Sequence, residues 1–486
     1  MAPPSMQVCF LGTSTTPVPT RNYSSLLVKI DRDAVMVDCG EGTQRQLFTP
    51  SVHADTKLTH IHTILITHLH PDHLLGLVPM MFTMMGLSAP APRHGGPRLE
   101  IYGPLGLRAH LRTTLATCYA SLSSNYVVHE LLWPDQPAYP HELPPDAPPV
   151  FRYVEGDPTL PPGVRGQERI LPLMPPHANE LPGRNIRMDP MTCTWPDVAT
   201  LAHAGNVHLS AAPITHRCPT IGYVFQEPPS ASQSISPRDL AQLDSNTEAL
   251  FHEQGIRNPR VLLKALLRDR TPLHLPDGTT LHPPALDRPG RKLCILGDTS
   301  DASADLVAFD DIGQATEPLR GMLHLARDVD LLVHECTYAS MRPEDVALAR
   351  TVSDAHAHLL TTHLLDVDEA ETRAVSRGHS TPQIVGTFAG RIGAHSVALN
   401  HFSARIPAPY TATHAPLTSE AQLAQNEHYE ESVQRFHVMR EIERQVTRFW
   451  HEIMQRTLGK TPGESRAMAA YDGLVLDVAP RPAATS

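Results

Sequence analysis

Short apolar segments, several of which end in a polar cluster, recur along most of the chain. Their length and their Val, Ile and Leu content predict buried strands. The predicted strands are 6–12, 25–30, 34–37, 61–66, 99–103, two halves of 207–225, 293–296, 331–333 and 397–399. Helical patterns follow some of them, as at 74–77 and 105–115. The pattern therefore predicts a chain that mixes strands and helices.

A different pattern begins after residue 410. Apolar residues recur there every three to four positions, which is the spacing of one face of a helix. They are Tyr429, Val433, Phe436, Met439, Ile442, Val446, Phe449 and Ile453. We predict one long amphipathic helix that opens at Thr418 or Ser419 and closes near Gly459, then a strand at 473–478. The last residues, 480–486, are predicted to be a disordered tail.

Two stretches differ from the rest in composition. Residues 133–200 hold sixteen prolines in 68 positions and show little apolar periodicity, so we predict a largely irregular surface insertion. Residues 251–292 carry eight Lys or Arg against four acidic residues. The excess of positive charge in residues 251–292 fits either a solvent-exposed surface or a local binding site for a polyanion.

The composition limits where the protein works and what it contacts. The formal net charge is −11, so a contact with nucleic acid must be local. The seven cysteines are scattered and form no CxxC pair, which favours a reducing compartment. No signal peptide, transit peptide or membrane-spanning segment is evident, and we expect a protein of the cytoplasm or nucleus.

Residues of the types that bind metal ions are most concentrated in Thr67 to His73, whose sequence THLHPDH follows a predicted strand. Histidines at i and i+2 of an extended segment can point two imidazoles at one metal ion, and the aspartate and histidine beyond the bend can reach a second ion. Imidazole and carboxylate are typical zinc ligands. This loop therefore predicts a metal site.

Other ligand-type residues stand at the ends of later predicted strands. Together with the first loop they form a set of seven oxygen and nitrogen donors, enough for two metal ions if one carboxylate is shared. The set is His68, His70, Asp72, His73, His216, Asp298 and His401. Asp298 is the expected bridge because it lies in a tight Gly-Asp-Thr turn. Two ions ~3.5–4 Å apart can clamp both the attacking and the leaving oxygen of a phosphodiester.

The order and flanks of these motifs resemble the short form of tRNase Z (ribonuclease Z), within the metallo-β-lactamase superfamily. The matching segments run from Leu11 to Arg405: LGTSTTPVPTRN, DCGEGTQRQL, ITHLHPDHLLGL, EIYGPLGLR, YVVHEL, PITHRCPTIGY, GRKLCILGDTS, DLLVHECTY, GHSTPQ and NHFSAR. The HxHxDH loop is common to the superfamily. The DCGEGTQ, GHST and HFSAR segments are more specific to tRNase Z.

The resemblance implies the fold and the site. The fold would be an α/β sandwich of four layers (αββα), to which this sequence adds surface insertions and a C-terminal helical extension that the family lacks. One zinc ion would be held by His68, His70, His216 and Asp298, and the other by Asp72, His73, Asp298 and His401. Asp72 would also be the general base, His379 would assist the leaving 3′ oxygen, and Glu335 would orient that imidazole. A helix-start hydrogen bond for His379 and a structural ion pair for Glu335 are the alternatives.

The resemblance also implies domains and partners. Residues 1–410 would form the catalytic domain, with the insertion at 133–200 and a tRNA-binding arm at 228–292, and residues 411–479 would add the long helix and the last strand. Precursor tRNA would be the substrate, and the protein would be a homodimer. Gly255 to Leu262 stands where the short form has a Gly-Pro-rich turn in its arm.

The implied activity is removal of the 3′ trailer from precursor tRNA, leaving a 3′-hydroxyl on the tRNA and a 5′-phosphate on the trailer. Two alternatives remain open at this point. One is a phosphodiesterase or esterase of the same fold that acts on a small substrate. The other is a homologue without catalytic activity that binds RNA.

Overall fold

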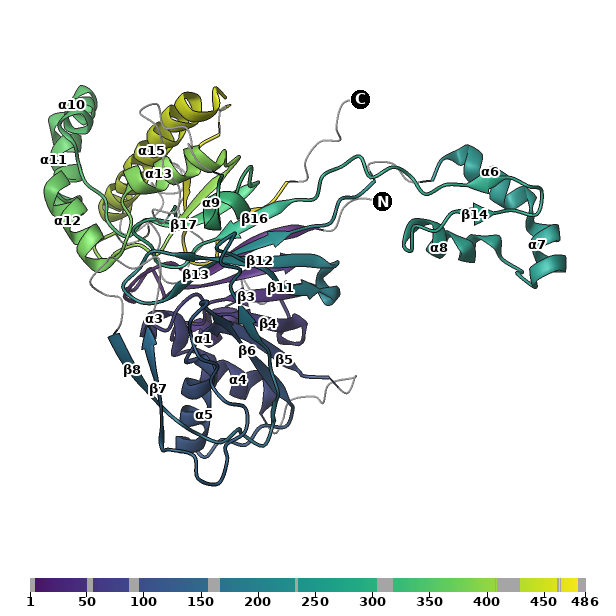
Figure 1. Ribbon diagram of the computed structural model, residues 1–486. Coiled ribbons are helices and arrows are strands. Elements are labelled where there is room, and N and C mark those ends of the chain that lie inside the picture. The colour runs from purple at the N-terminus through teal and green to yellow at the C-terminus, as the bar shows by residue number, and fades with distance from the viewer. Residues whose placement is uncertain are drawn as a thin grey trace. The chain divides into compact units, whose positions relative to one another are not determined.

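Two β-sheets that face each other form the core of the protein (Figure 1). The structure is a computed structural model that describes residues 5–49, 56–86, 96–155, 167–231, 235–303, 318–406, 408, 429–460, 463 and 465–479. Thr418, Ser419 and the tail at 480–486, for which the sequence suggested a helix start and disorder, lie outside the described residues.

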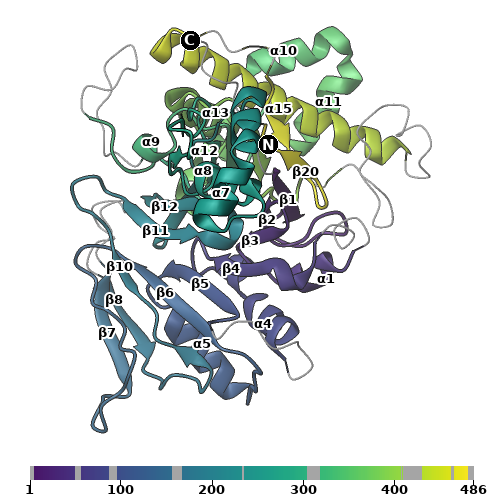
Figure 2. The same ribbon diagram turned by 90° about the vertical axis from the view of Figure 1, so that its right-hand side faces the viewer.

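The first sheet has nine strands and carries the HxHxDH loop. Its order is β10 (Asn185–Arg187), β6 (Tyr126–Leu132), β5 (Leu99–Pro104), β4 (Ile61–Leu65), β3 (Asp33–Val37), β2 (Ser25–Ile30), β1 (Met6–Gly12) and β20 (Val475–Asp477), with β9 (Glu180–Leu181) also paired to β6. Strands β3 to β6 run parallel, so their carboxyl ends meet at one edge. Figure 2 shows β20 beside β1, where it forms the edge strand of the sheet.

The second sheet has seven strands. Its order is β11 (Trp195–Leu201), β12 (Val207–Ile214), β13 (Thr220–Gln226), β16 (Lys292–Ile295), β17 (Leu331–Glu335), β18 (Val397–Asn400) and β19 (Met468–Ala469). Its parallel part, β16 to β19, again brings carboxyl ends together. Val, Leu, Phe and Tyr side chains of both sheets bury each other between the layers, among them Phe10, Val28 and Tyr223.

Helices cover the outer face of each sheet (Figure 1). On the first sheet they are α1 (Thr43–Leu47), α3 (Pro71–Leu74), α4 (Leu77–Met85) and α5 (Leu107–Thr117), and α4 and α5 bury Leu and Met against it. The helices of the second half are α9 (Gly321–Leu325), α10 (Pro343–Val352), α11 (Asp354–His363), α12 (Val367–Arg377), α13 (Pro382–Ile392) and α15 (Tyr429–Leu458). This arrangement confirms the αββα sandwich. No helix among the described residues is long and apolar enough to cross a membrane.

The long C-terminal helix is confirmed as α15, which ends just before Gly459. Its predicted apolar face is buried at Met439, Ile442 and Val446 and packs on α13. Two glycines of α13 make this approach possible. A Cβ added at Gly386 would lie 2.5 Å from the Cβ of Phe449, and one added at Gly390 would lie 2.7 Å from the Cβ of Ile453.

The proline-rich segment is more ordered than we expected. Its described residues contain β9, β10 and β11, which extend the two sheets, and a hairpin of β7 (Val150–Glu155) and β8 (Gln167–Pro172). Trp133 and Trp195 are fully buried and meet edge to face, with ring centroids 4.9 Å apart. The expectation of a largely irregular insertion was wrong for these parts, because two buried tryptophans and short strands order them without any long periodic run.

Residues 227–291 form a second compact unit with a core of its own. It contains α6 (Pro237–Ser245), α7 (Thr247–Gln254), α8 (Leu263–Leu267), β14 (Leu273–His274) and β15 (Thr280–Leu281). Leu243, Leu250 and Leu266 are fully buried at its centre. At its two chain ends, the Arg291 guanidinium lies 2.7 Å from Glu227 Oε1. We call this unit the arm.

Candidate metal centre

The seven residues singled out by the sequence meet at one place, at the carboxyl ends of strands from both sheets. His68 and His70 follow β4, and His70 is the residue before α3. His216 lies in the turn between β12 and β13. Asp298 follows β16, and His401 follows β18. The ligand-type residues that were selected at the ends of predicted strands therefore lie together in the structure.

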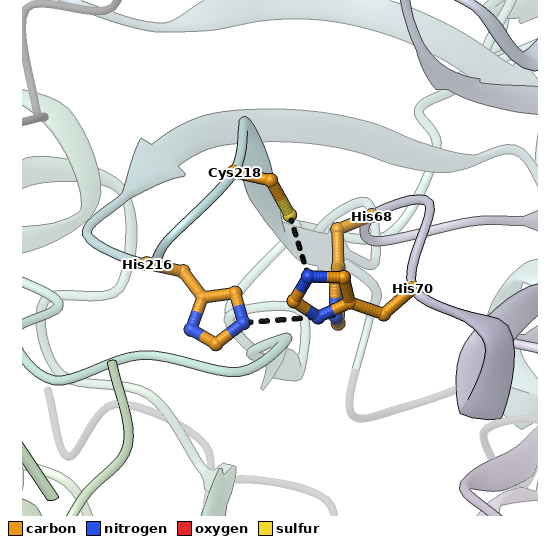
Figure 3. A group of neighbouring side chains, drawn as sticks. All are labelled: His68, His70, His216 and Cys218. Atoms are coloured by element: carbon orange, nitrogen blue, oxygen red, sulfur yellow. Dashed lines mark hydrogen bonds between the residues drawn. The ribbon is translucent and has the colours of Figure 1, made fainter. Parts of the chain in front are cut away.

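One half of the cluster consists of three histidines whose ring nitrogens converge. His70 Nδ1 lies 3.0 Å from His68 Nε2 and 3.2 Å from His216 Nε2. Asp298 Oδ2 lies 3.7 Å from His68 Nε2 and 3.9 Å from His216 Nε2. Figure 3 shows the three imidazoles grouped together, with Cys218 beside them. We call these three histidines and Asp298 the first group.

The outer nitrogens of the same imidazoles bind protein atoms. The Gly378 carbonyl oxygen can only accept, so His216 Nδ1–H donates to it at 2.6 Å. The Thr67 hydroxyl donates to Asp38, so it accepts from His68 Nδ1 at 3.0 Å. A neutral imidazole has one N–H, and these bonds leave the Nε2 lone pairs of His68 and His216 facing inward. Burial favours the neutral form, holding the pKa of His68 well below its usual value and lowering that of His216 to about 4.

The other half consists of Asp72, His73, His401 and the second oxygen of Asp298, which we call the second group. His73 Nε2 and His401 Nε2 are 3.1 Å apart. Asp72 Oδ2 lies 3.3 Å from His401 Nε2 and 3.6 Å from His73 Nε2. The Asp72 side chain is 20% exposed, against 3% for Asp298, so Asp72 is the carboxylate that water reaches.

Asp298 lies between the two groups, as expected of a bridge. Its Oδ1 is 3.4 Å from His73 Nε2, while its Oδ2 faces the first group. Burial opposes its charge, but the imidazoles of His401 and His73 keep its pKa well below the usual value. Asp298 is therefore a buried anion whose two oxygens point to different sets of imidazoles.

The second group has its own outer partners, and the sequence analysis missed two of them. His73 Nδ1 lies 2.7 Å from Asp38 Oδ2, and His401 Nδ1 lies 3.1 Å from Thr337 Oγ1. Asp38 directly follows β3, so the rule that found Asp298 would also have found it. Thr337 carried no such signal, because a single threonine in a loop suggests no metal chemistry.

Glu335 and His379 are in direct contact at the edge of the second group. His379 Nδ1 is 3.1 Å from Glu335 Oε1, which also accepts the backbone N–H groups of Thr299 and Ser380. Burial works against a charged His379, but Glu335 raises its pKa above the usual value. The alternative of a helix-start hydrogen bond has no support, because α13 has no side-chain cap and begins after Thr381.

The donor set fits a metal cation. In the first group, the inward Nε2 lone pairs of His68 and His216 both lie at hydrogen-bond distance from His70 Nδ1, and a neutral His70 has at most one N–H to place between them. In the second group, two carboxylates, Asp298 and Asp38, raise the pKa of buried His73 well above its usual value despite burial, so positive charge is favoured there. Nitrogen lone pairs and carboxylate oxygens converging in this way suit zinc.

The chain is similar to several proteins of known type. A family model described as "Anti-Pycsar protein Apyc1" matches residues 6–113. The chain is 30% identical over 407 residues to the zinc phosphodiesterase ELAC protein 1 of Bos taurus, covering 82% of this chain and 87% of that protein. It is 28% identical over 402 residues to ribonuclease Z of Kineococcus radiotolerans, covering 82% and 84%.

Solved structures also match over most of the chain. Human tRNase Z, short form, is 24% identical and covers 82% of this chain and 93% of its own, with a TM-score of 0.44. The metallo-β-lactamase fold protein YhfI of Bacillus subtilis is 11% identical and covers 98% and 99%, with a TM-score of 0.42. The two-sheet architecture and the relatives over most of the chain show that this protein has the metallo-β-lactamase fold and belongs to the ribonuclease Z family, whose members include the zinc phosphodiesterase ELAC protein 1.

Proposed function

We propose that this protein is a zinc-dependent endoribonuclease that removes the 3′ trailer from precursor tRNA. The cut would leave a 3′-hydroxyl on the tRNA and a 5′-phosphate on the trailer. The observation that carries the proposal is the pair of ligand groups that share Asp298 beside the Glu335–His379 pair. Membership of the ribonuclease Z family supports the choice of RNA over a small substrate.

Two zinc ions would occupy the centre. His68, His70, His216 and Asp298 would hold one, and Asp72, His73, Asp298 and His401 would hold the other. The support is the presence of two convergent donor groups rather than one. Bound zinc supplies Lewis acidity toward phosphate oxygens and lowers the pKa of water toward ~7.

Asp72 would act as the general base. It is the most exposed carboxylate of the centre, and it belongs to the same group as His73 and His401. A carboxylate held in this position can accept a proton from an attacking water while it also helps to hold the ion. His401 and His73 hold its pKa below the usual value although burial opposes this, so the side chain is ionised.

His379 would donate a proton to the leaving 3′ oxygen. Its Nδ1 is used by Glu335, so Nε2 is the ring nitrogen left for the substrate. Glu335 itself is fixed by three backbone N–H groups and by the Thr337 hydroxyl, which donates to Oε2 at 2.7 Å. Glu335 therefore acts through His379 by orienting its ring and favouring its protonated form.

The arm would hold the body of the tRNA. Arg257, Arg260, Lys264 and Arg268 are exposed on it, and phosphate contacts from such side chains supply affinity without reading sequence. Arg260 differs from the others because it forms an ion pair with Asp244, at 2.9 Å. Arg257, Lys264 and Arg268 are therefore our preferred phosphate contacts.

Two further features belong to the proposal: the oligomeric state, which follows from the family resemblance, and the location, which follows from the composition. The protein would be a homodimer, which light scattering during gel filtration tests directly. It would work in the cytoplasm or nucleus, in keeping with seven cysteines of which none is in a disulfide. Fractionation of the source cells tests the location.

The decisive experiment is incubation of the zinc-loaded protein with a 3′-extended precursor tRNA and mapping of both new ends. We expect one cut at the 3′ side of the tRNA body, with the end groups stated above. The Asp72→Ala variant is the control and should not cut. Cleavage of a small phosphodiester alone, with intact precursor tRNA, would instead favour a small-substrate enzyme, and tight tRNA binding without any cut would favour a non-catalytic RNA-binding protein.

A further inference from the structure

A sulfur atom lies beside the three histidines of the first group, within 4.8 Å of a ring nitrogen of each, at a residue to which the sequence analysis assigned no role. Cys218 stands two residues after His216, in the turn between β12 and β13. Its Sγ is 3.6 Å from His70 Nε2 and 3.9 Å from Thr220 Oγ1. Figure 3 shows the side chain directed at the His70 ring on the side away from His216.

The two nitrogens of His70 therefore have different surroundings. Nδ1 faces His68 Nε2 and His216 Nε2 at 3.0 and 3.2 Å, inside the first group. Nε2 faces the Cys218 sulfur. If Nδ1 offers its lone pair inward, as the Nε2 atoms of His68 and His216 do, the single N–H of a neutral imidazole must be on Nε2. That N–H then points at the sulfur.

We propose that Cys218 is a positioning residue, whose sulfur accepts a hydrogen bond from His70 Nε2–H and so directs His70 Nδ1 at the metal ion. The other histidines of the centre have oxygen partners for the same purpose: the Gly378 carbonyl for His216, Thr67 for His68, Asp38 for His73 and Thr337 for His401. Cys218 completes this series with sulfur in place of oxygen. The inference rests on the zinc centre proposed above.

Sulfur in this position has a physical consequence. A thiol is a weaker hydrogen-bond acceptor than a carbonyl or carboxylate, so His70 is the least firmly oriented imidazole of the centre. Outer partners of metal-binding histidines typically contribute ~10–100-fold to metal affinity. We expect the lower end of that range for Cys218, with the effect confined to the ion that His70 binds.

The test compares Cys218→Ala and Cys218→Ser with the wild type. Zinc affinity is measured by competition with a chromophoric chelator, and the cobalt-substituted proteins are compared by their visible absorption. Cys218→Ala should weaken one of the two bound ions about tenfold and shift the cobalt ligand-field bands, with the other ion unchanged. Cys218→Ser should restore most of the affinity, because a hydroxyl can accept the same N–H. Cys118→Ala, which removes an exposed cysteine at the end of α5, is the matched control and should change neither measurement.

Three results would overturn the inference in distinguishable ways. Equal affinity and equal cobalt spectra in Cys218→Ala and the wild type would show that the sulfur does not position His70, while the zinc centre stands. A thiolate-to-cobalt charge-transfer band in the wild type that is lost in Cys218→Ala would make Cys218 a ligand instead. A wild-type protein that takes up no zinc or cobalt would remove the proposed centre and this inference together.

Discussion

At the scale of single residues, the centre depends on outer partners as much as on the ligand-type side chains. Each histidine has one nitrogen turned inward and another occupied by a neighbouring group, such as Asp38 beside His73 or Gly378 beside His216. The sequence showed which residue types stand at strand ends, and that was enough to find the inner set. A backbone carbonyl or a lone threonine leaves no signal in a sequence, so these partners became visible only in the structure.

The His379→Ala variant separates chemistry from metal binding. It should lose ~10²–10⁴-fold in the rate of precursor-tRNA cleavage, the usual contribution of a general acid or base. It should keep its full zinc content, because His379 is outside the two proposed ligand groups and contacts Glu335 through Nδ1. The measurements are single-turnover cleavage and metal analysis of the same sample.

A Glu335→Gln variant is the companion to this test. It should lose less rate than His379→Ala, since it weakens the orientation of the ring without removing it. Loss of zinc from His379→Ala would contradict the assignment, because the residue would then be a ligand or a support for one.

At the scale of elements, prediction from sequence succeeded where one face of a periodic segment is buried. The strands at 6–12 and 25–30 were placed with their observed ends, and the apolar face of α15 was located. It failed in the proline-rich segment, where the three-residue strand β10 is held by pairing with β6, which lies far earlier in the chain. Pairing of that kind leaves no local period in the sequence.

The contact of α13 with α15 offers a test of packing at this scale. Gly386→Val should lower the free energy of unfolding by roughly 1–3 kcal/mol or more, because its Cβ would meet the Phe449 Cβ at 2.5 Å and overpacking costs that much. Denaturant unfolding of the metal-free protein measures the change. Gly463→Ala is the control, since a Cβ there meets no atom within 4 Å, and an equal loss in both variants would mean that close packing is not the cause.

The arm is an element with a functional prediction. Replacing Arg257, Lys264 and Arg268 by Gln should raise KM for precursor tRNA, while hydrolysis of a small chromogenic phosphodiester should barely change. Each lost phosphate contact should also reduce the slope of log affinity against log salt by roughly 0.7–0.9. Binding and cleavage are measured over a range of salt concentrations.

Arg260→Gln is the matched control for the arm, because this arginine is held by Asp244. It should change the salt dependence less than any one of the other three substitutions. Equal losses on tRNA and on the small substrate would indicate damage to the fold, and no loss on tRNA would show that the arm does not hold it.

At the scale of the whole molecule, the two ends of the chain are joined around the centre. Asp472, in the loop before β20, accepts hydrogen bonds from the Asn22 backbone N–H, the Thr13 hydroxyl and the Gln46 amide at 2.6–2.8 Å. Asp472 thereby holds the loop between β1 and β2. In that loop the Thr15 N–H donates to the carbonyl oxygen of Phe402 at 3.0 Å, and Phe402 is the residue after His401. No local pattern in the sequence predicts a contact between residues 13 and 472, because it depends on the pairing of β20 with β1.

Asp472 gives this junction a pH dependence. Burial raises its pKa from 3.8 to about 6, against the opposing effect of its donors and Arg21. The folded protein then keeps a proton that the unfolded chain releases, so the stability from this group is present below pH 3.8 and is lost as the pH rises to about 6. In the Asp472→Asn variant, this loss of stability between pH 3.8 and about 6 should disappear.

The measurement is the denaturation midpoint of metal-free wild type and variant across this pH range. The difference between the two curves removes the contribution of the histidines, which both proteins share. Parallel curves would show that Asp472 does not titrate in the folded state in this range.

The pairing of β20 with β1 also has a consequence for synthesis of the protein. Strand β1 can pair with β2 early in synthesis, but its other edge stays unpaired until residues 475–477 have left the ribosome. At a translation rate of about 5–20 residues per second, the roughly 450 residues that separate β2 from β20 take roughly 20–90 seconds to synthesise. An unpaired strand edge of this kind is a template for aggregation. Until residues 475–477 emerge, the growing chain therefore has an open edge at β1, and His401 becomes available only late in this interval.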